Sequence, residues 1–223
     1  SMIEADSAAG TRYRMLETLR AFGADRLAAA GEDEAAARHL IGWAVGLAAR
    51  IGADLATERE PEADALLRRE LPNLRAAWRL ALARGALDDA AAMVVPLYDA
   101  VAYRDLIEIR GWAESLADDP AVPSRPWAGA LLGTAAEAAY HRGDHDRAVR
   151  LARAGLARAT DEQGPWRCLM VLSVVALARG AHAETIEHAL AAAALAKEAR
   201  ETPGIAALAA AYSGDLARAR ELN

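Results

Sequence analysis

Three glycines, Gly143, Gly180 and Gly214, occur at nearly the same phase of three helical patterns. Their spacings are 180 − 143 = 37 and 214 − 180 = 34 residues. In each pattern an Ala/Leu-rich helix ends at the glycine, a short polar turn follows and a second such helix begins. A period in the mid-thirties is typical of stacked helical hairpins. The spacing therefore predicts an all-α chain whose hairpins bury their apolar faces against one another.

The repeat predicts three helical hairpins after residue 126. The first pairs 127–140 with 144–159, the second pairs 165–179 with 183–200, and the third pairs 203–212 with a helix cut short at Asn223. Small residues fall where the two helices of a hairpin would cross: Ala136 and Ala148, Ser173 and Thr185, and Ala207 and Ala219. The 34-residue period and these positions favour a tetratricopeptide-like solenoid, and another antiparallel helical repeat is the alternative.

The first sixteen residues have a different pattern. Thr11, Tyr13 and Met15 alternate with Arg12 and Arg14, which is the period of a strand. We expect a short β-hairpin here, made of a strand, a turn at SAAG and a second strand. Because a lone hairpin is marginal in water, it must pack on the helices or belong to another domain.

Glycines and prolines divide the helical region that follows. Gly31 and Gly85 are expected to end helices, Pro72 to end another, and Pro96 to kink or split the helix around it. The segment 118–126, with its three prolines, is the strongest linker signal in the chain.

These signals divide the chain into three predicted parts. They are a hairpin with one helix over 1–30, a proximal helical array over 31–117, and the repeats over 127–223.

Composition excludes several functional classes. The chain has 223 residues, is 54% apolar and has a net charge of −6, with a pI near 5.4. Neither nucleic acid nor an acidic membrane is an expected partner, because both require a concentrated basic face. Cys168 is the single cysteine, so no intramolecular disulfide can form and a cytoplasmic location is expected. No apolar run is long enough to span a bilayer.

Three stretches resemble a known family. They are RYRMLETLRAF from Arg12, LRRELPNLRAAWRLALARG from Leu67 and YRDLIEIRGWAESLA from Tyr103. They are similar to segments of large ATP-binding bacterial transcriptional regulators, the signal-transduction ATPases. The first resembles the end of the winged-helix domain in that family, and the second resembles the opening of its helical-repeat region. The resemblance covers residues 11–117.

The resemblance implies a role rather than a reaction. It implies a non-enzymatic sensor arm that binds a protein segment, a small effector or its own ATPase module. No phosphate loop GxxxxGK[ST] and no recognition helix occur in the sequence, so neither an ATP site nor a DNA-reading residue carries over. A free-standing scaffold that assembles other proteins is the alternative, and an enzyme is a third, weaker hypothesis. Exposed apolar ends would favour a homodimer.

The candidate partner-binding residues lie on the predicted concave face of the repeats. We expect no catalytic, cofactor-binding or metal-binding residue. His141 and His145 are four apart in HRGDHD, but Gly143 lies between them, so a turn capped by Asp144 is the favoured interpretation over a metal site. The predicted concave-face residues are Gly133, Glu137, Tyr140 and His141 in the first hairpin, and Met170, Val174 and Leu177 in the second.

Overall fold

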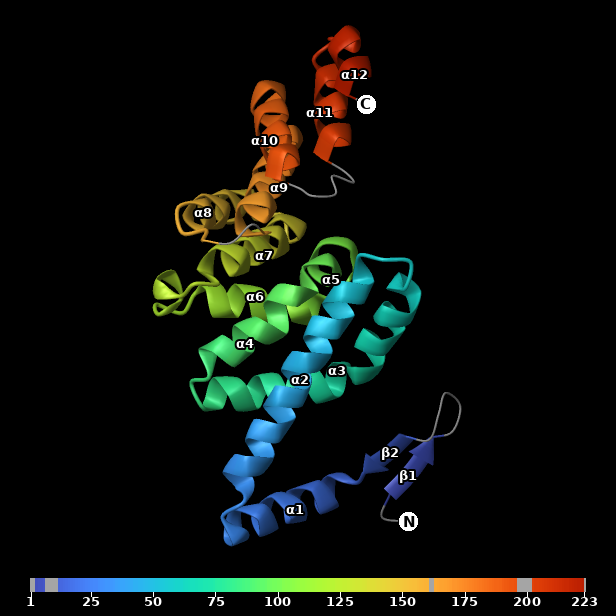
Figure 1. Cartoon of the computed structure of the whole chain (residues 1–223), viewed down its shortest axis with the longest axis vertical. Helices are drawn as coiled ribbons and strands as arrows, with labels where there is room; N and C mark the ends of the chain where they lie inside the picture. The colour runs from blue at the N-terminus through green and yellow to red at the C-terminus, as the bar shows by residue number, and fades with distance from the viewer. Residues whose placement is uncertain (1–2, 7–11, 161–162, 196–201, 223) are drawn as a thin grey trace.

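The fold is an elongated all-α stack in which helices pack against their neighbours in chain order (Figure 1). The computed structural model describes residues 3–6, 12–160, 163–195 and 202–222. The proximal helices are α1 (Glu17–Ala30), α2 (Asp33–Leu55), α3 (Glu60–Ala83), α4 (Leu87–Val94), α5 (Tyr98–Tyr103) and α6 (Ile107–Ala117). The distal helices are α7 (Ala128–His141), α8 (His145–Leu156), α9 (Gln163–Ala178), α10 (His182–Leu195), α11 (Thr202–Tyr212) and α12 (Leu216–Leu222).

Two short strands precede the helices. β1 (Ile3–Asp6) and β2 (Arg12–Met15) pair antiparallel, with Ile3 opposite Met15. The expected turn at residues 7–10 lies outside the described residues. The derivation of this segment from a winged-helix domain stays a prediction.

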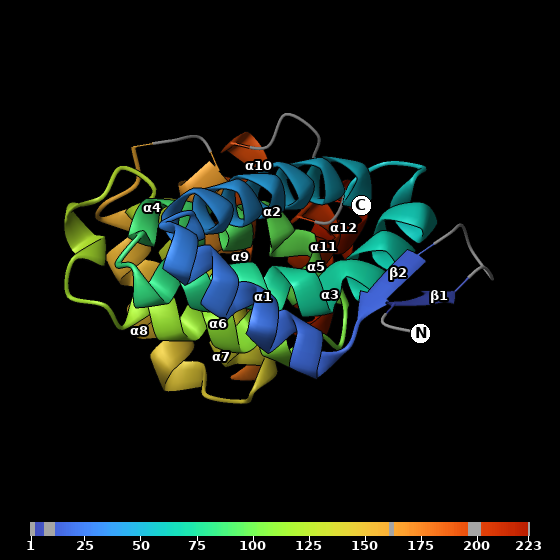
Figure 2. The same ribbon diagram turned by 90° about the horizontal axis from the view of Figure 1, so that it is seen from below.

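Helix α1 lies across the N-terminal end of the stack (Figure 2). The helix itself is as predicted and ends at Gly31, whose φ of 69° is left-handed. Helical spacing puts Leu19, Phe22 and Leu27 roughly on one face of α1, but no residue of α1 is buried and Phe22 is 57% exposed. Among the described elements, α2 makes the main contact with this helix and covers it in part.

The largest core cluster lies in the proximal array and continues into α7. Trp78 of α3 stacks on Trp112 of α6 with ring centroids 5.1 Å apart. Leu131 of α7 belongs to the same cluster, as does Val122 in the segment predicted to be a linker. Residues 118–126 form a loop that contains a short 3₁₀ turn, η2 (Val122–Ser124). Because Val122 and Leu131 are part of this core, the core crosses the boundary that the sequence predicted between the proximal array and the repeats.

Pro72 does not end a helix, so that prediction was wrong. Helix α3 runs through Pro72 without a break. Leu67 and Leu74, on either side of the proline, are both fully buried. Burial of both turns in one core offsets the lost hydrogen bond and the ring clash that proline introduces.

Pro96 splits its helix, as expected. Helix α4 ends at Val94, a 3₁₀ turn η1 (Val95–Leu97) follows, and α5 begins at Tyr98. Helix α2 passes close to this turn at Gly52, where an added Cβ would overlap the carbonyl oxygen of Pro96. The redirected chain brings Tyr98 against the distal helices.

The three glycines of the repeat adopt the same conformation. Gly143, Gly180 and Gly214 have φ values of 82°, 72° and 88°. At the first turn, the Gly143 N–H donates to the Tyr140 carbonyl at 2.8 Å and the Asp144 N–H to the Ala139 carbonyl at 3.0 Å. The other two turns repeat this pair of bonds, which is the Schellman motif.

The small residues at the predicted helix crossings are buried in the first two hairpins. Ala136, Ala148, Ser173 and Thr185 are fully buried. In the third hairpin Ala207 is 8% exposed, and Ala219 is half-buried against the cluster between α10 and α11. Helix α8 ends at Leu156, short of the predicted 159. Helix α10 is described as far as Leu195, and its predicted continuation to 200 falls on residues 196–201, outside the described part. Within that part, no helix is long and apolar enough to cross a membrane.

Candidate functional site

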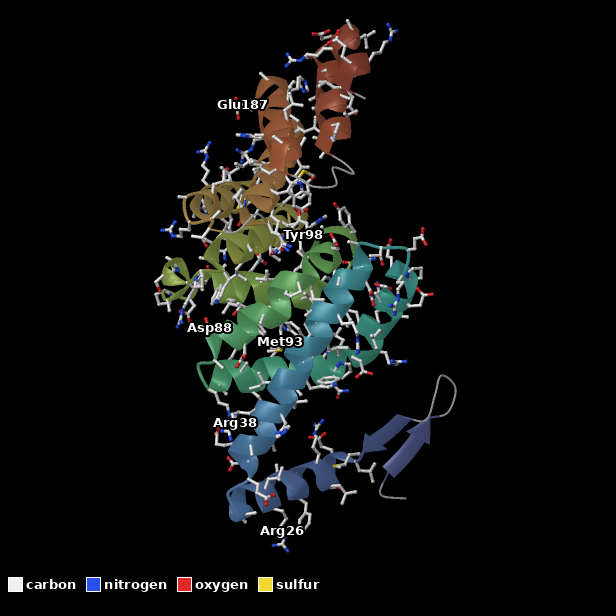
Figure 3. The ribbon with its side chains drawn as sticks, in the orientation of Figure 1. Arg26, Arg38, Asp88, Met93, Tyr98 and Glu187 are labelled. Carbon is white, nitrogen blue, oxygen red and sulfur yellow. The ribbon has the colours of Figure 1, made fainter. Side chains whose placement is uncertain are left out.

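A polar and aromatic cluster joins the proximal array to the distal helices, and Tyr98 is at its centre. Figure 3 labels Tyr98 where α5 meets the distal helices. Its hydroxyl donates to Oε2 of Glu137 on α7 at 3.3 Å. The guanidinium of Arg167 on α9 lies 4.7 Å from the Tyr98 ring centroid, and the Trp166 ring packs edge-on at 5.5 Å. We call these residues, with Thr134, the junction cluster.

Arg167 anchors the distal side of this cluster. It is the one charged residue of α9 and is only 6% exposed. Its Nη1 donates to the Thr134 hydroxyl at 3.0 Å, and its Nη2 donates to Oε1 of Gln163 at 3.1 Å. A buried charge of this kind is tolerated only when it is well solvated by such groups.

Burial controls the ionisation of the tyrosines here. Burial, with the nearby Glu137 carboxylate as the second cause, raises the pKa of Tyr98 well above its ordinary value. The same two causes raise the pKa of Tyr140. The raised pKa keeps the Tyr98 phenol protonated, as its hydrogen bond to Glu137 requires.

A second polar contact lies beside the first. Glu114 of α6 is 8% exposed and accepts from Nη1 of Arg142 at 2.7 Å. Arg147 of α8 lies 3.6 Å from the same carboxylate and also bonds Asp118 at 2.8 Å. Burial raises the pKa of Glu114 more than the two guanidinium groups lower it.

Hydrogen bonds also connect the start of α7 to the proximal array. The indole N–H of Trp127 donates to Oδ1 of Asp88 at 2.8 Å, and Arg125 lies 3.3 Å from the other carboxylate oxygen. Asp88 therefore accepts a hydrogen bond from a tryptophan 39 residues away in the chain.

The predicted concave face is partly closed, which corrects the expectation for three residues. Gly133 is buried, and a Cβ there would lie 2.8 Å from Cβ of Arg167, because α9 packs directly on α7. Glu137 is 7% exposed under Tyr98, and Met170 is 5% exposed. A partner cannot reach these side chains while the helices stay packed.

The other predicted residues are more accessible. Tyr140, Val174 and Leu177 are half-buried, and Leu177 packs against the cluster between α10 and α11. His141 is exposed as a residue, and its Nε2 lies 3.2 Å from Oε1 of Glu137. The Tyr140 ring stacks on His145 with centroids 5.7 Å apart. Partner binding at these residues stays a prediction.

The HRGDHD turn is built as a cap. Oδ1 of Asp144 accepts from the Arg147 N–H at 3.0 Å, as an N-cap does. Asp215 makes the same bond to Arg218 at the third turn. Among the described residues, no group of three or more His, Cys, Asp or Glu side chains is placed to hold a metal ion.

Sequence reasoning missed the junction cluster. One signal was available, because Arg167 interrupts an otherwise apolar helix and so had to be buried with polar partners. Its contact with Tyr98 could not be read from the sequence, because the two residues are far apart in the chain and meet only after Pro96 redirects α5.

Comparison of the chain with protein-family models, with curated proteins and with solved structures finds no match.

Proposed function

We propose that the chain is a non-enzymatic interaction module whose stacked hairpins bind a protein segment or a small effector. The observation that supports this most is the exposed apolar surface on the last described hairpin. Leu208, Tyr212 and Leu216 are 42%, 65% and 59% exposed. Stacked-repeat proteins use such faces for association, because each hairpin needs a neighbour to bury it.

The finer assignment is to a tetratricopeptide-like solenoid. The Schellman turns at Gly143, Gly180 and Gly214 and the buried small residues at the first two crossings support it. We further propose that β1, β2 and α1 derive from a winged-helix domain, and that the module belongs to an ATP-binding bacterial transcriptional regulator in the cytoplasm. The resemblance of residues 11–117 supports this proposal.

In such a regulator the junction cluster would transmit the state of the repeats. Tyr98 of α5 donates a hydrogen bond to Glu137 of α7, and beside this cluster Glu114 of α6 accepts one from Arg142, which directly follows α7. Both bonds have directional requirements. A partner that shifts the distal helices would have to break these bonds and form others. Binding at the repeats would thereby change how the distal helices pack on the proximal array.

The first test is the gene sequence upstream of the codon for Met2. A phosphate-loop motif encoded there in frame supports the regulator. A stop codon followed by a start codon supports the alternative, a free-standing scaffold that assembles other proteins.

The second test removes residues 127–223 from the intact regulator. We expect the deletion to change its ATPase activity or the transcription of its target genes, measured with purified protein and with a reporter. Unchanged ATPase activity and unchanged transcription would contradict the proposal.

A further inference from the structure

The exposed side of α2 has a shallow hollow that the proposed function does not use. Its volume is about 520 Å³, and Figure 3 labels one of its residues, Arg38, on the N-terminal half of α2. Trp43 contributes a side chain that is 43% exposed. The opposite side of the same helix is buried in the core. The lining residues are Ala35, Arg38, His39, Gly42 and Trp43.

The backbone of α2 is accessible along this hollow. A Cβ added to Gly42 or to Gly46 would meet no atom within 4 Å. Residues four apart flank the groove into which a ridge of side chains from a second helix packs. Two glycines at this spacing let a second helix approach closely, with Trp43 beside the contact.

The one charged residue that lines the hollow is positive, although the chain as a whole has a net charge of −6. The lining contains an arginine and a histidine and no acidic residue. Arg38 makes no ion pair with any described residue. The acid Glu34 on the preceding turn is already paired, with 3.3 Å between its Oε1 and Nη2 of Arg84. A partner with carboxylate side chains complements this surface.

We propose that this hollow is the docking site for an acidic amphipathic helix of another protein. Small residues of that helix pack over Gly42 and Gly46, an apolar side chain contacts the Trp43 indole, and a carboxylate pairs with Arg38. This inference deepens the proposed function, because it names the partner chemistry for one surface of the same module.

The test measures binding of synthetic helical peptides to the whole chain by fluorescence polarisation. One peptide is an amphipathic helix of Leu, Ala and Glu, and a second has Lys in place of every Glu. A third has the composition of the first with its leucines scattered around the helix. We expect only the first to bind, and we expect its affinity to fall as salt is added, since the charges are exposed.

Substitutions inside and outside the hollow test whether the peptide binds there. Trp43→Ala and Arg38→Glu should each weaken binding about tenfold or more, because exposed Trp and Arg side chains dominate interface energies. Gly42→Leu should abolish binding, because the leucine side chain would fill the space that the peptide helix occupies. The substitution should not disturb the fold, since a Cβ at Gly42 meets no atom within 4 Å. Tyr103→Ala and Arg218→Glu are the matched controls outside the hollow and should change nothing, because Tyr103 is an exposed aromatic residue of α5. Circular dichroism checks that each variant folds.

Three results would overturn the inference. The first is no binding of the acidic peptide, or equal binding of the acidic and basic peptides. The second is loss of binding in the Tyr103→Ala control to the same extent as in Trp43→Ala. Self-association of the chain that depends on Trp43, seen by sedimentation without peptide binding, would also overturn it in favour of a second copy as occupant. The proposed function survives each of these results if the deletion of residues 127–223 still alters the regulator.

Discussion

Gly52 shows how a single residue sets the distance between two elements. An added Cβ at this position would overlap the carbonyl oxygen of Pro96, which is backbone and cannot move aside as a side chain can. On the same helix, Gly46 has open space around it. Two glycines of one helix therefore have opposite structural requirements, and only the fold distinguishes them.

We predict that Gly52→Ala destabilises the protein by about 1–3 kcal/mol, because the helix and the η1 turn must separate. The control Gly46→Ala should be neutral or should stabilise by up to about 1 kcal/mol, since alanine favours a helix interior. Urea unfolding followed by circular dichroism measures both. Equal effects of the two substitutions would contradict the close approach of α2 to Pro96.

Tyr98 offers a second test at the residue scale. Tyr98→Phe removes the hydroxyl that donates to Glu137 and leaves that buried carboxylate with one bond fewer. We expect a loss of about 1 kcal/mol in the free energy of unfolding. The control is Tyr212→Phe, because the Tyr212 side chain is exposed and should tolerate the change. A Tyr98→Phe variant as stable as wild type would show that the junction bond contributes nothing.

Helix α3 illustrates how tertiary packing overrides local preference within an element. Proline is unfavourable in a helix interior, yet α3 continues through Pro72, so the helix end predicted there was wrong. The signal at Pro96 was of the same kind, and there the helix does split. The two prolines differ in their surroundings. Buried leucines on either side of Pro72 hold both turns of α3 in one core. At Pro96 the chain changes direction between α4 and α5, where η1 packs against α2.

We therefore predict that Pro72→Ala stabilises the protein by up to about 3 kcal/mol, the cost of proline in a helix interior. Pro61→Ala is the control, because Pro61 lies in the first turn of the same helix, where proline is tolerated. Thermal unfolding of both variants measures the difference. A destabilised Pro72→Ala variant would mean that the proline ring makes packing contacts worth more than the restored hydrogen bond.

At the scale of the whole molecule, three polar contacts between described residues connect the proximal and distal parts. They are the junction cluster around Tyr98, Glu114 with Arg142 and Arg147, and the Trp127 indole with Asp88. The apolar core also crosses between the parts, since it includes Leu131 of α7. The apolar contacts hold the parts together, and the directional polar contacts fix their relative orientation.

Glu114 gives this connection a pH dependence. Its pKa is raised in the folded state, so the folded state binds the proton more tightly than the unfolded state. The stability that this group contributes is complete below the ordinary carboxyl pKa and is lost as the pH rises through the raised pKa. We predict that wild type loses stability relative to Glu114→Gln as the pH rises through this window.

Glu108→Gln is the control for this prediction, with the opposite sign. A hydrogen bond from Arg75 lowers the pKa of Glu108, so the stability it contributes is lost as the pH falls through the lowered pKa. Urea unfolding over a series of pH values measures both differences. If wild type gained stability relative to Glu114→Gln with rising pH, ion pairing with Arg142 would outweigh burial.

The sequence by itself determined the local structure of the repeats. Gly143, Gly180 and Gly214 predicted the positions of three turns, and the small residues predicted where the helices of the first two hairpins cross. These features depend on backbone conformation and side-chain size within a few residues, so they can be predicted from the sequence pattern.

Only the tertiary structure decided which faces are covered. It buried Gly133, Glu137 and Met170, which the sequence placed on an open concave face, and it left the apolar face of α1 largely uncovered. It also brought Tyr98 to Arg167 and left Trp43 exposed beside Arg38. Helical periodicity shows that a face is apolar, but the element that covers that face is set by the path of the whole chain.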